Sequence, residues 1–174
     1  MKRVIIAIML AAAFAASVFT ASAKPRSVGV GLGAYQNISM QHMIYGTDRF
    51  FQLDLGYHVG VRQYGMAYTG DQGTLRLMAT YNIPIMSFDW TPEGTWNFYA
   101  GPGFTLASDF SSDKALSIGV AAQAGIEYLF DDIPLQLSAD VRPFAGLIIS
   151  NDRFMYDLDG LMGFIPTISA RYWF

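Results

Sequence analysis

The stretch Ile165-Pro-Thr-Ile-Ser-Ala-Arg-Tyr-Trp-Phe174 ends the chain and decides its fold. Counted back from Phe174, every second residue is apolar or aromatic: Tyr172, Ala170, Ile168 and Pro166. The residues between them are polar, namely Arg171, Ser169 and Thr167. A period of two is that of a β-strand with one apolar and one polar face. The chain therefore ends on a predicted amphipathic strand whose last residue is aromatic.

The same alternation recurs along the chain in segments of roughly 9–11 residues, the length that a tilted membrane strand needs. We expect eight such strands, over residues 28–35, 39–45, 51–62, 75–83, 96–107, 117–128, 135–142 and 166–174. The second is the least regular, because residues 40–45 break the alternation. We also expect a longer turn over residues 86–95 and a bulge at Pro102, which cannot donate a ladder hydrogen bond. An even strand number favours an eight-stranded antiparallel transmembrane β-barrel, all-β and of up-and-down topology.

Composition allows two β-folds. The chain is 52% hydrophobic and 15% aromatic, yet no apolar run after Phe19 is long enough for a transmembrane helix. A secreted soluble β-sandwich shows the same alternation, but it has no reason to sort its aromatic residues by strand end. Here one group lies at one end of the predicted strands: Phe50, Phe51, Tyr81, Trp96, Phe98, Tyr128, Phe130, Tyr172, Trp173 and Phe174. A sparser group lies at the other end: Tyr64, Tyr68, Phe110, Phe154, Tyr156 and Phe164. Two such levels are typical of the aromatic girdles of a membrane barrel.

The N-terminus predicts export. Lys2 and Arg3 precede an apolar, Ala-rich run, and Ala21-Ser-Ala23 is a small-x-small cleavage site. We therefore expect residues 1–23 to be a cleaved signal peptide and residues 24–174 to form one barrel domain. Without Lys2 and Arg3, nine of the 11 basic residues remain against 14 acids, a net charge of −5 that argues against nucleic acid as a partner. The sequence contains no cysteine, which excludes disulfides, Cys-ligated metals and a lipid-modified N-terminal cysteine.

Two parts of the sequence resemble known proteins. The last strand, with Tyr172 and Phe174, looks like the closing strand of bacterial outer-membrane barrels, which the barrel-assembly machinery reads. Residues 125–143 read GIEYLFDDIPLQLSADVRP. This stretch resembles G-x-E-Y-x-F-x-D-I-P-L-x-L-S-x-D-x-x-P of the small outer-membrane β-barrel proteins of Bacteroidota. The resemblance implies an eight-stranded barrel similar in architecture to OmpX and the OmpA membrane domain, and it implies no reaction.

The predicted inward face carries charges that must pair in a narrow lumen, because isolated ions away from bulk water are costly. The set is Asp54, His58, Arg62, Arg76, Glu127, Asp140, Arg142 and Arg171. We expect a structural ionic network that plugs the barrel, since eight strands leave an interior that side chains can fill. Asp140 and Arg171 are the expected direct pair, because their strands are neighbours. Inward glycines either make room for Arg and Tyr side chains or leave a cavity or small ligand pocket.

Other chemistry is weakly supported. Only His42 and His58 could serve a catalytic hydroxyl, and neither lies in a recognisable Ser–acid pattern. Asp152, Asp157 and Asp159 could bind a divalent cation but fit a solvated loop equally well. We expect no cofactor and no enzymatic activity. The expected role is structural or in surface interaction, with outer-membrane lipids and lipopolysaccharide around the wall. A small-solute channel or a lipid- or ligand-binding barrel remains the alternative, and a lipid-modifying barrel enzyme is third.

Overall fold

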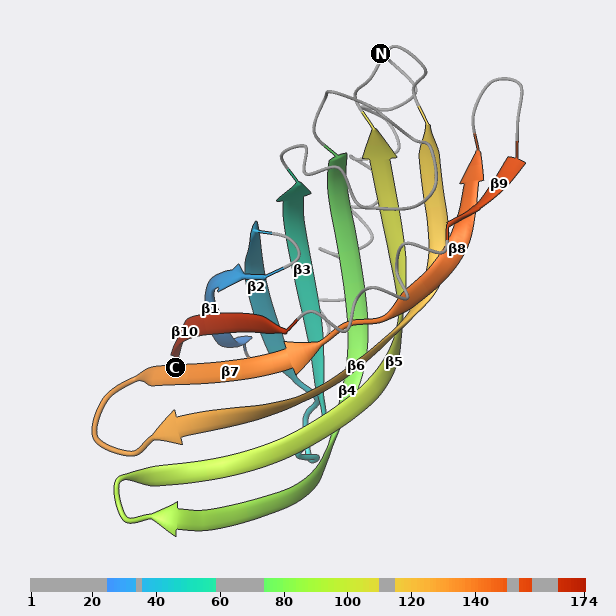
Figure 1. Cartoon of the computed structure of the whole chain (residues 1–174). Helices are drawn as coiled ribbons and strands as arrows, with labels where there is room; N and C mark the ends of the chain where they lie inside the picture. Colours follow the sequence, from blue (N-terminus) through green and yellow to red (C-terminus); the bar gives the residue numbers. More distant parts are fainter. Residues whose placement is uncertain (1–24, 34–35, 59–73, 110–114, 150–153, 158–165) are drawn as a thin grey trace.

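A computed structural model of the chain describes residues 25–33, 36–58, 74–109, 115–149, 154–157 and 166–174 (Figure 1). These residues form antiparallel strands joined by turns, and none of them forms a helix long and apolar enough to cross a membrane. The strands are β1 (Pro25–Leu32), β2 (Gln36–Met43), β3 (Phe50–His58), β4 (Thr74–Thr91), β5 (Gly94–Asp109), β6 (Leu116–Phe130), β7 (Leu135–Val141), β8 (Phe144–Ile149), β9 (Phe154–Asp157) and β10 (Thr167–Trp173).

The sheet closes on itself as an eight-stranded antiparallel barrel, which confirms the all-β barrel architecture that the sequence predicts. Each strand from β1 to β6 pairs with the next one along the chain. The ring is completed by β6 with β7, by β7 with β10, and by β10 with β1. In the closing pair, Val28 lies opposite Tyr172 and Leu32 opposite Ile168. The C-terminal strand therefore joins the two ends of the sheet.

The ten segments occupy eight positions because two of the eight strands are interrupted. Both β7 and β8 pair with β6, and the register is the same on either side of the break. Pro143 lies at that break and has no N–H for the ladder, although its carbonyl still accepts from the Ala122 amide at 2.9 Å. The eighth strand is likewise divided, with β9 on β8 and β10 on β7. The seventh strand is thus longer than predicted, since it continues to Ile149 instead of ending at Arg142.

The hairpin of β4 and β5 also differs from the prediction. Residues 86–95 do not form a long turn, because β4 runs to Thr91 and β5 begins at Gly94. Pro102 does not cause a bulge: Thr80 opposite Gly103 and Ile83 opposite Ala100 share one register. The register shifts occur between Pro84 and Met86 and between Phe88 and Thr91. Because β3 begins opposite Asn82, residues 83–91 of β4 extend beyond it and pair only with β5.

The alternation predicted from the sequence appears as an apolar outside and a polar inside. On β3, Gln52 and Asp54 are buried, whereas Leu55 is 44% exposed. Among the described residues the buried side chains are mostly polar or charged, and the large exposed ones are mostly apolar. The same division holds on β2, which reads as regular over Asn37, Ser39 and Gln41. This is the inverse of a soluble domain, whose core is apolar.

The expected aromatic level is present on the outer face with one correction. Ring contacts connect neighbouring ends of β4, β5 and β6. They run from Phe88 and Trp90 through Trp96 and Tyr128 to Phe130. Phe50, in contrast, is fully buried in the barrel interior and packs edge-on against Tyr99 at 5.3 Å between ring centroids. Its position at the end of a strand predicts a place in the girdle, but Phe50 and Phe51 are neighbours in one strand and therefore face opposite sides.

Candidate functional site

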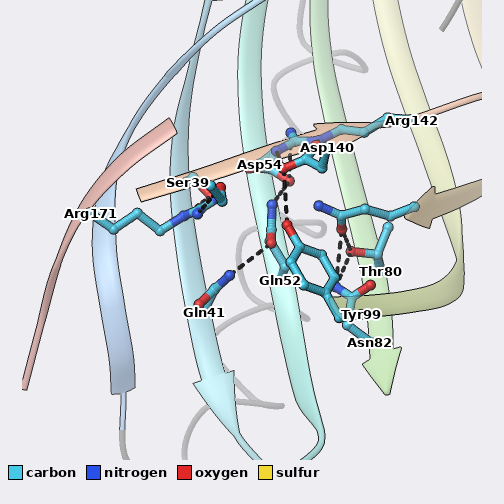
Figure 2. A network of polar contacts seen from close by, with 12 residues as sticks. Ser39, Gln41, Gln52, Asp54, Thr80, Asn82, Tyr99, Asp140, Arg142 and Arg171 are labelled. Carbon is cyan, nitrogen blue, oxygen red and sulfur yellow. Dashed lines mark hydrogen bonds and ion pairs between the residues drawn. The ribbon is translucent and has the colours of Figure 1, made fainter. Parts of the chain in front are cut away.

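The barrel interior gathers the side chains most capable of chemistry. Figure 2 shows inward residues from several strands joined by hydrogen bonds and ion pairs. We call this set the lumen network and define it by its connected contacts, from Arg26 and Glu127 through Gln136, Gln41 and Gln52 to Asp54, Arg142, Asp140 and Tyr99. Its members come from six strands and from the break after β7, so the network crosses the lumen.

One arginine holds two carboxylates at the centre of the network. Arg142 Nη1 lies 3.0 Å from Asp54 Oδ2 on β3, and its Nε and Nη2 donate to Asp140 on β7. The Tyr99 hydroxyl donates to Asp140 Oδ2 at 3.1 Å. All four side chains are buried. Three charges and a phenol thus meet across β3, β5 and β7, where one arginine faces two carboxylates. Asp54 Oδ1 has no hydrogen-bond partner among the described residues.

A glycine makes this cluster possible. A Cβ built on Gly125 would lie 2.5 Å from Asp140 Cβ and 2.9 Å from the Tyr99 hydroxyl. Gly125 is the β6 residue opposite both Tyr99 and Asp140. The absence of a side chain there lets the phenol reach the carboxylate. Of the two roles that the sequence left open for the inward glycines, room for Tyr and Arg side chains is the one found here.

Glu127 has a partner that the sequence analysis missed. Arg26, the second residue of β1, forms an ion pair with Glu127, and Asn97 Nδ2 donates to the same Oε1 atom at 3.2 Å. The Arg26 guanidinium also lies 4.8 Å from the centroid of the Phe50 ring. The sequence predicts a strand that begins at residue 28, which places Arg26 outside the sheet. The alternation with Val28 and Val30 would place the Arg26 side chain on the outer face of the barrel. A shift in the β1–β2 register between Pro25 and Ser27 accompanies its inward placement instead.

Three glutamines link the two charged clusters. Gln136 Nε2 donates to Gln41 Oε1 at 2.9 Å and also bonds Glu127. Gln41 Nε2 donates to Gln52 Oε1 at 3.0 Å, and Gln52 Nε2 donates to Asp54 Oδ2 at 2.9 Å. Each of these glutamines is at most 1% exposed. Since Gln136 and Gln41 lie on β7 and β2, their bond spans the two strands between them and forms a polar layer across the interior.

The expected pair of Asp140 and Arg171 is not formed. The register places Arg171 opposite Gln136, while Asp140 lies opposite Thr167. Arg171 donates through Nε to Ser39 Oγ at 2.9 Å and through Nη1 to Ser138 Oγ at 2.7 Å. To reach Ser39 on β2 it passes β1 at Gly29, which lies opposite both residues. Adjacency of strands was a correct guide to proximity, but a four-residue offset along them kept these two charges apart.

The remaining predicted residues are spread around the wall. Arg76 is buried on β4, donates to Thr105 at 3.1 Å, and lies 3.8 Å from the centroid of the Phe144 ring. His58 lies at the end of β3, and its side chain falls outside the described residues, as do Arg62, Asp152 and Asp159. His42 is buried near the end of β2. Among the described residues no group of three or more His or acidic side chains could hold a metal ion.

The interior serines contact arginine and glutamine side chains. The hydroxyls of Ser39 and Ser138 accept from Arg171, and Ser27 donates to Gln41. Tyr172 and Phe174, the expected assembly residues, lie outside on the closing strand with their rings 5.8 Å apart. Comparison with protein-family models, with curated proteins and with solved structures found no match to this chain.

Proposed function

We propose that this protein is an integral outer-membrane β-barrel with a structural or surface-interaction role, and that its lumen is plugged by the network described above. The observation that carries the proposal is the inverted surface of a closed barrel. Leu32, Val120 and Ile168 are 66%, 70% and 65% exposed, whereas Arg171 and Glu127 are each 1% exposed. An uncovered apolar wall of this extent is unfavourable in water and favourable against lipid.

The plug is supported by the contacts across the lumen. Eight strands leave room for side chains and little more. Here Arg142 bridges β3 and β7, and Gln136 reaches Gln41 on β2. Such crossings obstruct a diffusion path. The chain's likeness to small outer-membrane barrels of Bacteroidota in residues 125–143 agrees with a role of this kind and names no activity.

Membrane location and plugging are tested by two measurements on one preparation. The chain, expressed with its N-terminal segment in a Gram-negative host, is expected in the outer-membrane fraction after extraction with carbonate and urea. Purified and refolded, it is expected to give no stable conductance in planar bilayers. Recovery as a soluble protein contradicts the membrane assignment. Steady conductance from a correctly inserted barrel contradicts the plug and favours the alternative, a narrow small-solute channel.

A further inference from the structure

Two buried groups of opposite charge in the interior each have one polar atom without a partner. Asp54 Oδ1 and Arg171 Nη2 form no hydrogen bond among the described residues. Asp54 uses its other oxygen, Oδ2, for Arg142 and Gln52. Arg171 uses Nε and Nη1 for two serines. One carboxylate oxygen and one guanidinium N–H group are therefore left over in the same interior.

The pairing register places these two residues in one row across the wall. Arg171 on β10 lies opposite Gly29 on β1. Gly29 lies opposite Ser39 on β2, which in turn lies opposite Asp54 on β3. Because Gly29 has no side chain, the Arg171 side chain passes over β1, and its Nε donates to Ser39 Oγ at 2.9 Å (Figure 2). The guanidinium has thus already crossed β1 and lies one strand short of Asp54.

The free N–H group of Arg171 lies on the same edge of the guanidinium as the bond to Ser39. Nε and Nη2 form one edge of the planar group, and Arg142 uses that edge to hold both oxygens of Asp140. In Arg171 the Nε end of this edge is bonded to Ser39 on β2, so Nη2 faces the same side. Nη1 donates instead to a serine on β7, at 2.7 Å. The unused donor is therefore on the side of the guanidinium where β2 and β3 lie.

The balance of charge favours a change of partner for Asp54. Arg142 faces two carboxylates, and it holds Asp140 through both Nε and Nη2. It contacts Asp54 through Nη1 alone, at 3.0 Å. Arg171 has no carboxylate within ion-pair distance in the described parts of the chain. Transfer of Asp54 to Arg171 leaves one acid for each of the two arginines, and a paired charge is the less costly one to bury.

We propose that Asp54 exchanges between two arginines, leaving Arg142 to pair with Arg171 in a second, less populated state of the barrel. In the described state the Arg142–Asp54 pair spans the lumen from the break after β7 to β3. In the second state the pair follows the wall along β10, β1, β2 and β3, and Arg142 is released from β3. The exchange removes one contact across the lumen without leaving Asp54 unpaired. As a means of regulating the plug it rests on the proposed function, whereas the exchange itself requires only the closed barrel.

NMR relaxation dispersion of the refolded chain, residues 24–174, in detergent micelles tests the exchange. We expect the Arg171 Nε resonance to show exchange on the microsecond-to-millisecond timescale, with a second state on the order of 1% of the molecules. Asp54→Asn keeps the shape of the side chain and removes its charge, so the exchange at Arg171 should be lost. Glu127→Gln makes the matching change in the cluster that contains Arg26, and it should leave the exchange in place.

Arg142→Met gives a second readout. In this variant Asp54 has only Arg171 as a cation within reach, so the second state should become the main one. The Arg171 Nε resonance should then move to the chemical shift that dispersion assigns to the minor state of the wild type. The double variant Asp54→Asn/Arg142→Met should not show this shift, because the charge that draws Arg171 is gone.

Three outcomes would overturn the proposal. They are a flat dispersion profile at Arg171 in the wild type, exchange that persists unchanged in Asp54→Asn, and a folded Arg142→Met whose Arg171 resonance stays at the wild-type position. If either variant does not refold, the other one decides together with the wild type. Conductance in planar bilayers tests the plug separately, so a conducting barrel that shows the exchange contradicts the proposed plug and leaves this inference in place.

Discussion

At the scale of single residues, Arg142 is the side chain on which the lumen network most depends, because it holds Asp54 and Asp140 together. Arg142→Met leaves two buried carboxylates without their cation and is expected to lower the free energy of unfolding by about 3–5 kcal/mol. Asp140→Asn should cost clearly less, since Arg142 keeps Asp54 and the amide oxygen can still accept from Tyr99. Urea titrations of the refolded barrels measure both. Losses of only about 0–1 kcal/mol in both variants would show that the lumen is hydrated enough to screen the cluster. A larger loss in Asp140→Asn would contradict the central role of Arg142.

Gly29 and Gly31 offer a second comparison between single residues. A Cβ on Gly29 would lie 2.0 Å from the Ala170 carbonyl oxygen, which is backbone and cannot turn away. A Cβ on Gly31 would meet only the ends of the Asn37 and Ser169 side chains, at 2.6 and 2.8 Å. Gly29→Ala should therefore destabilise the barrel by at least the roughly 1–3 kcal/mol of an overpacked site, and Gly31→Ala by less. The midpoint of urea unfolding decides; a milder Gly29→Ala would refute the close approach of β1 and β10.

The sequence pattern predicts which side chains face inward but not which residues they contact. A period of two placed Asp54, Glu127 and Asp140 on the inner face, where they are. It could not name their partners, because partners depend on the offset between strands and on reach across the lumen. Arg171 is the instructive example: it lies beside Asp140's strand, yet it bonds a serine on β2 that is 132 residues away in the chain.

At the scale of strands, the β4–β5 hairpin differs most from the prediction, because both strands are longer than the sequence pattern indicates. The sequence predicts that β4 ends at residue 83 and that a turn follows over residues 86–95. Instead, β4 accommodates Pro84 at a bulge and continues to Thr91. Residues 83–91 have no partner on the β3 side, so Pro84 lies where a missing N–H costs least. Proline and bulges are also the devices that keep an open edge from pairing with another molecule.

Strand faces give a prediction of their own on β3. Leu55 faces outward and is 44% exposed. If lipid covers that face, Leu55→Arg places a cation near the middle of the bilayer and should cost about 2–4 kcal/mol in folding from urea into lipid vesicles. Leu55→Ala removes the same apolar group without adding charge and serves as the control. An arginine tolerated as well as the alanine would mean that the outer face is not in contact with lipid.

At the scale of the whole molecule, alternation and strand count were enough to predict a closed eight-stranded barrel. The interruption at Pro143 changed the number of segments without changing the number of positions in the ring. Closure was predictable from the even number of strands and from the resemblance of the last strand to the closing strand of outer-membrane barrels. The extent of the interior network was not predictable, since it depends on residues such as Arg26, whose inward placement accompanies a register shift between β1 and β2.

The N-terminal segment supplies a prediction for the whole chain. Residues 1–24 lie outside the described residues, and the Ala21-Ser-Ala23 pattern predicts cleavage after Ala23. Protein extracted from the outer membrane should therefore begin at Lys24, as N-terminal sequencing or intact mass can show. Ala23→Pro, which blocks processing at that site, should leave a longer precursor in the inner membrane. Membrane-extracted protein that still begins at Met1 would rule out the cleaved segment.

The distances in sequence between the bonded residues of the interior have a consequence for kinetics. The bond between Gln136 and Gln41 joins residues 95 positions apart, and the Arg26–Glu127 pair joins residues 101 positions apart. Contacts of such long range form late in folding, because the entropy of the intervening chain must be lost before the contacts can stabilise the fold. We therefore expect the side-chain contacts of the interior to form only when β1 pairs with β10 and the barrel closes. Interactions absent from the transition state slow unfolding more than they speed folding. The closed barrel is therefore expected to have a low unfolding rate.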